Sequence, residues 1–383
     1  MIKEQNTRAK ACNHLQTAAL QFCTPNQIAE IRGFGAGHIN DTFLVSTAAS
    51  FSECFILQRI NGRVFSRPES IMQNIRVLTE HISERLALNP VPGRRWEMPR
   101  ILPTTDSREY WIDSDGHFWR AISFIEDAES FNSVISLEHA YEVGYAMGIF
   151  HTLVSDLPLE RLTDTLEGFH ITPLYVSRYE AVSKKGNIST SVDTAYCMNF
   201  IDKRKKFATV LENAKADEKL PLRVTHGDPK VSNVMIDTKT GLAVSVVDLD
   251  TVKPGIINYD IGDSLRSSCN PLGEDPSNPE EVRFESDLCR ALLMGYFSAA
   301  DNLLTENEIS IIYDSVRLLA FELGVRFFTD FLEGNIYFKV KDRSQNLRRA
   351  LVQFKLAESI ESQAETLCAM IGEVKSAGKK RPI

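Results

Sequence analysis

The chain has 383 residues, of which 43% are hydrophobic and 25% are charged, and its formal net charge is -8 at pH 7. A chain of this length is too long for one ordinary core and predicts two packed lobes or domains. The negative charge disfavours broad binding to the phosphate backbone of nucleic acid. No apolar run approaches the roughly 20 residues that a membrane span requires.

The N-terminal sequence and the cysteines indicate a cytoplasmic protein. Residues 1–20 lack the apolar core and the small-residue cleavage site of a signal peptide. The seven cysteines are scattered and form no CxxC pair, a pattern that favours reduced thiols over a disulfide framework or a zinc site. We expect a monomer that has neither a nucleic-acid nor a membrane partner.

The first third of the chain predicts a small, mostly antiparallel sheet with one helix across it. A short helix is expected at about residues 8–22, and IRGFGAGHINDTFLVST then predicts two strands joined by a glycine turn. The sequence CFILQRI predicts a third strand over Cys54–Ile60. Apolar residues at helical spacing predict a helix over 68–86. Two aromatic-rich runs on either side of the turn signal at Asp115 predict a hairpin.

Helices dominate the remainder of the chain. Helical spacing covers 137–154, 200–214, 284–304, 309–334 and about 345–375. Two short β signals, VMID and AVSVVDLD, are separated by TKTG, which predicts a hairpin with an acid at its exit. The fold class is therefore α+β, with an N-lobe of residues 1–127 and a larger, mainly helical C-lobe of residues 128–383.

The segment RVTHGDPKVSNVMID gives the strongest chemical signal. Asp228, on a loop before a strand, can orient a hydroxyl group and accept its proton. Asn233 can turn its carbonyl oxygen toward a hard cation, and Asp248, at the end of the next strand, supplies a second oxygen of the kind that Mg²⁺ favours. This order matches the template of phosphoryl-transfer kinases, and Lys230 is placed to reach the transferred phosphate. Asp and Gly are common in turns, so the prediction depends on the three residues together.

The glycine turn GFGAGHIN is a weaker signal. Gly33, Gly35 and Gly37 allow the backbone to approach a phosphate closely, although a plain hairpin turn also fits. The P-loop pattern GxxxxGK[ST] does not occur, and no GxGxxG follows a strand and opens a helix.

The third strand has a glutamine where a nucleotide kinase of this type usually has a lysine. Gln58 occupies that inward position, and its amide carries no charge. Either Arg59 or Lys230 compensates for the missing cation, or Mg²⁺ and backbone donors carry most of the phosphate charge.

These motifs resemble the aminoglycoside phosphotransferase and choline kinase family, whose members are protein-kinase-like enzymes that act on small molecules. The matching stretches run through nearly the whole chain: GHINDTFLV, FILQRIN, WRAISFIE, RVTHGDPKVSNVMID, VVDLDTVKPG, DIGDSLR and RFFTDFLEGNIYF. The pattern HGDxxxxN and the later Asp are shared by the whole group. The stretches GHIN, DLDTVKPG and RFFTDFLEGNIYF are similar to the N-acetylhexosamine 1-kinases in particular. The resemblance implies a bilobal protein-kinase-like fold and transfer of a phosphoryl group from ATP, with Mg²⁺, to the anomeric C1 hydroxyl of GlcNAc or GalNAc.

The resemblance also implies roles for the catalytic and nucleotide-binding residues. Asp228 matches the catalytic base, and Asn233 and Asp248 match the magnesium ligands. The turn Gly33–Gly37 matches the loop over the ATP phosphates. The inter-lobe hinge that borders adenine is matched by Phe124, Ile125 and Glu126.

For the acceptor, the resemblance implies that Arg326 and Tyr337 hold the hexosamine, and His38 is expected near the same pocket. Taken alone, these residues fit simpler interpretations. Arg326 lies four residues before Asp330 on a predicted helix, a spacing that fits a surface ion pair. Tyr337 alone fits a core or edge aromatic.

Other polar residues near the motifs are expected to be structural. Asp260 and Asp263 form an acidic pair in NYDIGDSLR, and Asp263 is placed to cap a helix beginning at Ser264. His226 is expected to stabilise the catalytic loop, and His151 to be a packed or partly exposed histidine.

Three alternatives to a sugar kinase stay open. A kinase of the same fold could act on choline, which requires an aromatic cage for its cation, on an aminoglycoside, which requires an acidic pocket, or on homoserine. A nucleotide-binding regulator without turnover is favoured only by Gln58. A protein kinase lacks support because no APE-type segment or activation loop follows DLD.

Overall fold

The computed structural model of the protein describes residues 14–23, 28–35, 39–47, 54–185 and 191–378. The chain divides into two compact units. The first comprises Met1–Glu80 and Met98–Glu126, and the second comprises His81–Glu97 and Asp127–Ile383. The predicted α+β class, with an antiparallel sheet in the N-terminal part and a mainly helical C-terminal part, is confirmed.

Residues 81–97 belong to the second unit, whereas the sequence placed them in the N-lobe. Arg94 Nη1 donates to Glu142 Oε2 at 2.5 Å, and the Glu97 amide donates to the Val244 carbonyl at 3.0 Å. These partners lie far along the chain, so no local pattern could have indicated where this segment packs.

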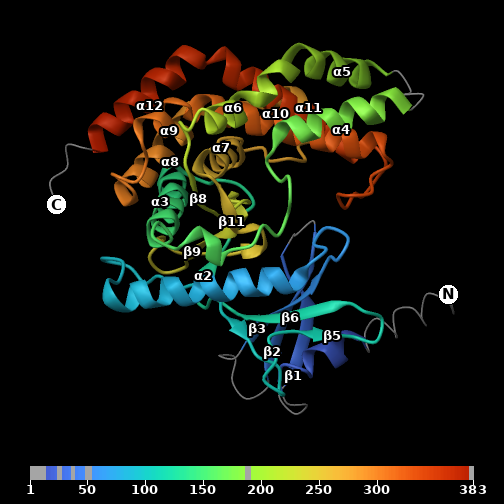
Figure 1. Ribbon diagram of the computed structural model, residues 1–383, viewed down its shortest axis with the longest axis vertical. Helices are drawn as coiled ribbons and strands as arrows, with labels where there is room; N and C mark the ends of the chain where they lie inside the picture. The colour runs from blue at the N-terminus through green and yellow to red at the C-terminus, as the bar shows by residue number, and fades with distance from the viewer. Residues whose placement is uncertain (1–13, 24–27, 36–38, 48–53, 186–190, 379–383) are drawn as a thin grey trace. The chain divides into compact units, whose positions relative to one another are not determined.

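The first unit is built on a sheet in the order β1-β2-β3-β6-β4, with β5 also beside β6, and every pairing is antiparallel (Figure 1). Its strands are β1 (Ile28–Gly33), β2 (Asp41–Thr47), β3 (Cys54–Ile60), β4 (Ile101–Leu102), β5 (Trp111–Ile112) and β6 (Phe118–Ser123). β3 has the predicted bounds, and the β5–β6 pair confirms the predicted hairpin.

One face of this sheet and a short helical stretch make the core of the first unit. Residues 14–19 are helical, and Ala18 and Ala19 pack with Leu57 and Ala121, which face each other across β3 and β6. Helix α2 (Pro68–Leu88) buries the apolar face that its sequence predicted.

The second unit consists mainly of helices. The α-helices that its description includes are α3 (Leu137–Leu153), α4 (Thr172–Lys185), α5 (Val192–Arg204), α6 (Val210–Ala216), α7 (Ile257–Ser268), α8 (Ser286–Ala299), α9 (Glu306–Ser310), α10 (Ile312–Leu332), α11 (Gln345–Ser362) and α12 (Ala364–Gly378). Short 3-10 helices cover Leu159–Arg161, Lys205–Thr209, Val231–Asn233, Leu249–Thr251 and Pro279–Glu281. α10 packs against α4, α7 and α11, so it forms the centre of the helical layer (Figure 1).

Two small β structures lie within the second unit. β7 (Ala128–Glu129), β9 (Val234–Asp237) and β10 (Ala243–Val246) form a sheet in the order β10-β9-β7, and the β9–β10 hairpin confirms the prediction. β8 (Leu222–Thr225) pairs with β11 (Lys253–Ile256), a pairing that the sequence did not indicate. Because β8 leads into HGDPKVSN and β11 follows VVDLD, this pairing brings the two motifs together.

Three helical predictions need correction. The predicted helix 200–214 is interrupted by a 3-10 turn at Lys205–Thr209, which places Phe207 beneath the Arg317 guanidinium at 3.8 Å. The stretch 345–375 splits at Gln363, whose side-chain amide donates to the Phe284 carbonyl at 2.9 Å. α7 begins at Ile257, so Asp263 lies inside a helix and cannot cap one. The predicted end of α10 is confirmed, because Gly334 follows it with φ 92°.

No helix in the described part of the chain combines the length and the apolar character needed to cross a membrane.

Candidate active site

The loop between β8 and β9 brings three of the predicted catalytic and metal-binding residues together. Lys230 Nζ donates to Asp228 Oδ2 at 2.7 Å. Asn233 Nδ2 donates to the Asp228 backbone carbonyl at 2.8 Å and to Asp228 Oδ2 at 3.2 Å. The side chains of Asp228 and Lys230 are 30% and 31% exposed, so the pair is accessible to a substrate. Because these contacts span only five residues, the spacing of the motif determines them.

The charges of this loop stabilise one another. Burial by itself would raise the pKa of Asp228, but the nearby Lys230 ammonium lowers that pKa below its usual value. Burial by itself would lower the pKa of Lys230, but Asp228 and Asp248 raise that pKa above its usual value. Asp228 is therefore a carboxylate at neutral pH.

Asp248 follows β10 in a left-handed backbone conformation, with φ 64° and ψ 58°. Residues other than glycine rarely adopt this conformation. The preceding residue fixes the two motifs to each other, since the Val247 amide donates to the Asn233 carbonyl at 2.9 Å. The structure thus places Asp248 beside Asn233 and close enough to Lys230 to raise its pKa.

The donor set of this loop fits a magnesium ion that is completed by phosphate oxygens. The Asn233 amide nitrogen is turned toward Asp228, which directs its Oδ1 to the other side. With the Asp248 carboxylate, it offers oxygen ligands of the kind that Mg²⁺ takes beside substrate phosphates. Within the described residues, no group of three or more His, Cys, Asp or Glu side chains could hold a metal ion.

Asp260 on α7 holds the first part of the catalytic loop. Its carboxylate accepts hydrogen bonds from the His226 amide at 2.6 Å and the Gly227 amide at 2.8 Å. It also bonds His151 Nε2 at 2.9 Å. Gly227 has φ 85°, and a Cβ atom there would lie 2.7 Å from the Thr251 carbonyl oxygen, so the loop requires glycine at this position.

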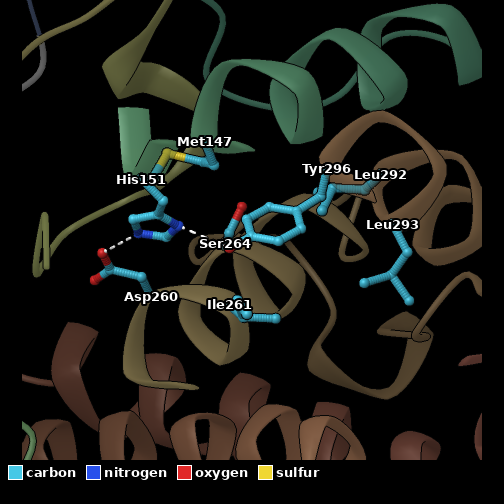
Figure 2. Close-up of a pocket in the computed structure, with 8 residues that line it drawn as sticks. All are labelled: Met147, His151, Asp260, Ile261, Ser264, Leu292, Leu293 and Tyr296. Carbon is cyan, nitrogen blue, oxygen red and sulfur yellow. Dashed lines mark hydrogen bonds and ion pairs between the residues drawn. The ribbon is translucent and has the colours of Figure 1, made fainter. Parts of the chain in front are cut away.

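Figure 2 shows how His151 supports this carboxylate. The imidazole lies between Asp260 and Tyr296, with Nδ1 3.0 Å from the Tyr296 hydroxyl. A small cavity of about 10 Å³ lies beside it, and the Ser264 hydroxyl in its lining has no hydrogen-bond partner within the described residues. The histidine is buried, and its ring contacts a carboxylate and a phenol. Its role is therefore structural, in support of the catalytic loop.

The segment that follows Asp248 is fixed from another direction. Lys253 Nζ donates to Asp164 at 2.8 and 3.0 Å and to the Leu166 carbonyl at 2.8 Å. The Thr165 hydroxyl donates to the Asp250 carbonyl at 2.9 Å. These contacts hold the backbone at Asp250 and the side chain of Lys253 in the segment that follows the hairpin.

Arg326 is largely buried in a ring of aromatic side chains. Its side chain is only 13% exposed, and the nearest carboxylate is Glu322 Oε1, 3.9 Å from Nη1. The guanidinium carbon lies 5.0 to 6.0 Å from the ring centres of Phe169, Tyr175, Tyr337 and Phe338. The surface ion pair with Asp330 that the spacing suggested is therefore wrong, because the helix turns Arg326 inward toward these rings.

Asp330 instead fixes the backbone that carries Tyr337. Its Oδ1 accepts hydrogen bonds from the amides of Ile336 at 2.9 Å and Tyr337 at 2.8 Å. Its Oδ2 accepts from the Phe338 amide at 3.0 Å and from Asn346 Nδ2 at 2.8 Å. The structure thus brings Arg326 and Tyr337 together, as the resemblance implied, with a buried carboxylate as the organiser.

In the first unit, the predicted phosphate turn meets the predicted hinge. Gly33 ends β1, and Gly35 follows with φ 74°. Phe34 between them packs edge-on against Phe124, with ring centres 5.9 Å apart. Ile125 is buried and Glu126 is exposed. Two predicted site residues, Gly37 and His38, lie outside the described residues.

Gln58 is engaged at both ends of its amide. Its Oε1 accepts from Arg120 Nε at 2.9 Å and Nη2 at 2.7 Å, and its Nε2 donates to the Thr42 hydroxyl at 3.2 Å. Arg120 is 1% exposed. Arg59 pairs instead with Asp41, which lies opposite it across β2 and β3, at 2.5 Å, so the cation beside Gln58 is Arg120.

Sequence reasoning missed several of these residues. Arg120 had a detectable signal, because an arginine in the apolar strand FWRAIS requires a buried partner. Asp260 was considered as a brace, but its bonds to the loop amides depend on α7 lying behind β8. Glu322 and His170, which lie between Arg326 and the loop, gave no signal because a lone buried polar residue has no characteristic spacing.

Comparisons with known proteins agree with this geometry. The family described as the phosphotransferase enzyme family matches residues 30–292, which is more than half of the chain. A microcompartment-associated aminopropanol kinase is similar over 93% of this chain and 98% of its own, with a TM-score of 0.62 and 15% identity. An aminoglycoside phosphotransferase from Alicyclobacillus acidocaldarius is similar over 96% of both chains, with a TM-score of 0.58 and 14% identity. An amicoumacin kinase, solved with AMP-PNP and Ca²⁺, covers 98% of this chain and 96% of its own, with a TM-score of 0.57 and 14% identity.

Proposed function

The chain belongs to the phosphotransferase enzyme family, and we propose that it is an ATP-dependent kinase that phosphorylates the anomeric C1 hydroxyl of an N-acetylhexosamine. The product would be a sugar 1-phosphate. The nucleotide part of the proposal is supported by the amicoumacin kinase, which has this fold and was solved with AMP-PNP and a divalent cation. We assign the ATP-phosphate loop to residues 1–127 and the catalytic and acceptor sites to residues 128–383.

The catalytic step that we propose depends on position more than on base strength. Phosphoryl transfer has a loose transition state, so the enzyme gains most by aligning the hydroxyl and neutralising charge. Asp228 orients the acceptor hydroxyl and takes its proton late in the step. Lys230, bonded to that carboxylate at 2.7 Å, supplies positive charge where the phosphoryl group crosses.

Asn233 and Asp248 would hold the metal ion through oxygen atoms. A bound Mg²⁺ neutralises the phosphate oxygens and helps to orient them. In the first unit we assign Gln58, which stands where such kinases usually have a lysine, to the ATP site. Its side-chain carbonyl is held by two hydrogen bonds from the buried Arg120 guanidinium.

The acceptor part of the proposal is carried by one observation: the nearly buried Arg326 guanidinium is surrounded by four aromatic side chains. An aromatic cage for choline would need these rings for the ligand's cation, but the protein's own guanidinium fills that position. A polycationic aminoglycoside would be repelled by Arg326. A neutral acceptor with hydroxyl and amide oxygens suits both the guanidinium donors and the neighbouring rings.

The finer identity of the acceptor rests on sequence resemblance. The segment RFFTDFLEGNIYF, which contains Arg326 and Tyr337, resembles the N-acetylhexosamine 1-kinases and distinguishes them within the wider group. We propose that Arg326 bonds oxygen atoms of the hexosamine and that Tyr337 packs against it.

An ATP-consumption screen tests the proposal directly. The purified chain is incubated with ATP and Mg²⁺ and with GlcNAc, GalNAc, glucose, choline, homoserine, aminopropanol and kanamycin in turn. ³¹P and ¹H NMR then locate the phosphate on the product. We expect turnover with an N-acetylhexosamine and a phosphate on O1. Phosphate on O6, or turnover with choline alone, rejects the anomeric assignment, and ATP binding without any turnover favours a regulator.

A further inference from the structure

His170 lies between the 3-10 helix at Leu159–Arg161 and α4, and the proposed phosphoryl transfer gives it no role. Its side chain is 5% exposed. Its backbone has φ 64°, in the left-handed region that side-chain-bearing residues rarely adopt. Strained conformations of this kind persist where the surrounding structure holds them, often near functional sites. The residue therefore needs an explanation from its contacts.

Both ring nitrogens of His170 face oxygen atoms that accept hydrogen bonds. Nε2 lies 2.8 Å from the Gly227 carbonyl oxygen, and Nδ1 lies 3.0 Å from Glu322 Oε1. A backbone carbonyl can only accept, so Nε2 carries a proton. An ionised carboxylate also only accepts, so Nδ1 carries a second proton. The two contacts together require an imidazolium, unless the second proton lies on Glu322.

The surroundings of Glu322 favour its ionised form. The Thr172 hydroxyl donates to Oε2 at 2.7 Å, and Arg326 Nη1 lies 3.9 Å from Oε1. Burial by itself would raise the pKa of Glu322, but His170 and Arg326 lower it below its usual value. Burial by itself would lower the pKa of His170, but the Glu322 carboxylate raises it above its usual value. Both shifts place the proton on the histidine.

The other charged and titratable groups around the imidazole come from α7 and α10. Tyr259 on α7 stacks on the ring, with centres 5.4 Å apart. Asp263 on α7 adds negative charge that favours the protonated ring. On α10, Glu322 is the direct partner, and Arg326 is the opposing cation. Two carboxylates and one arginine thus surround the histidine, a balance that favours its positive charge.

We propose that His170 is a positioning residue whose imidazolium ties the Gly227 carbonyl to Glu322, and thereby sets Asp228 at a fixed place relative to Arg326. The Gly227 amide is held by Asp260 at 2.8 Å. With His170 on the carbonyl, the residue immediately before Asp228 is held at both its amide and its carbonyl group. The consequence for turnover rests on the proposed function, but the charge of the ring does not.

The charge of the ring can be measured without any substrate. The full chain is labelled with ¹⁵N-histidine, and its ring nitrogens are observed by NMR at pH 7.5. The His170 signals are assigned by comparison with His170→Gln or, if that variant does not accumulate, with Glu322→Gln. A histidine with the usual pKa of about 6.5 is mostly neutral at this pH, whereas we expect both nitrogens of His170 to be protonated. A neutral ring with a single protonated nitrogen would overturn the proposal.

Kinetics with ATP and GlcNAc test the positioning role. Glutamine at position 170 carries no charge and has one donor nitrogen in place of the two that face Gly227 and Glu322, so we expect kcat to fall by about 10- to 100-fold, as small misplacements of reacting groups do, with less than a twofold change in the KM for ATP. We expect the wild-type kcat to fall at high pH, where His170 loses its second proton. In Glu322→Gln this fall should begin at a lower pH, because His170 holds that proton less tightly. His117→Gln is the matched control, since its imidazole also lies 3.0 Å from a carboxylate but is 45% exposed.

The outcomes separate the two proposals. The positioning role is refuted if His170→Gln retains the wild-type kcat. It is also refuted if the fall of kcat at high pH occurs at the same pH in Glu322→Gln as in the wild type. If no sugar is phosphorylated by the wild type, the proposed function fails, while the NMR spectrum still decides the charge of the ring.

Discussion

Replacing Asp330 by alanine should both destabilise the second unit and weaken binding of the acceptor. The carboxylate is 3% exposed and accepts three backbone amides and one side-chain amide at 2.8 to 3.0 Å. Its removal leaves one N–H of the fully buried Asn346 amide unpaired, while Asn335 Oδ1 still accepts from the same nitrogen at 3.0 Å. It also releases the backbone of residues 336–338, on which Tyr337 depends.

The expected size follows from these bonds. Leaving a buried donor unpaired costs about 1–3 kcal/mol. The backbone amides of 336–338 belong to partly exposed residues and regain bonds to water, so each contributes less. We therefore expect the free energy of unfolding to fall by about 2–4 kcal/mol. The KM for the sugar should rise at least fivefold, while the KM for ATP changes little, because the released segment carries an acceptor residue.

Urea denaturation followed by circular dichroism measures the stability, and steady-state kinetics measures the two KM values. Asp342→Ala is the matched control, because Asp342 lies between α10 and α11, a few residues after the released segment, but is 52% exposed and pairs with Arg348 at the surface. Surface pairs of this kind contribute about 0–1 kcal/mol. If Asp330→Ala loses no more stability than Asp342→Ala and keeps the wild-type KM for the sugar, Asp330 does not organise the acceptor segment.

Three further changes test other parts of the structure. Asp228→Asn should reduce kcat by at least 10³-fold with nearly unchanged ATP affinity by calorimetry, since it removes the group that orients and deprotonates the hydroxyl; near wild-type turnover would reject its role. Lys230→Met should raise the pKa of Asp228, because the ammonium holds that pKa down, so the acid limb of kcat/KM should move to higher pH; an unmoved limb would show that the 2.7 Å pair does not govern the titration. Gly144→Ala should lower the free energy of unfolding by about 2–3 kcal/mol in urea melts, because its Cβ would lie 1.9 Å from the Leu292 carbonyl oxygen and force α3 and α8 apart; a neutral effect would contradict the close helix packing.

The sequence by itself determined the elements and the local part of the catalytic site. The strand Cys54–Ile60, the helix α2 and the β9–β10 hairpin were readable because their patterns repeat over a few residues. The spacing of Asp228 and Asn233 was equally readable, since their side chains meet within a single loop. Local geometry of this kind is set by neighbouring residues, so a motif can specify it.

Only the tertiary structure decided what surrounds these residues. Asp260 reaches the catalytic loop from 33 and 34 residues away, and His170 connects Gly227 to Glu322 across separations of 57 and 152 residues. Arg120 meets Gln58 only because β3 and β6 are neighbours in the sheet. Such contacts depend on how whole elements pack, and a single polar residue has no periodicity that would predict its partner. The sequence thus specified a phosphoryl-transfer loop, whereas the packing of α7 and α10 decided how that loop is held and what lies beside it.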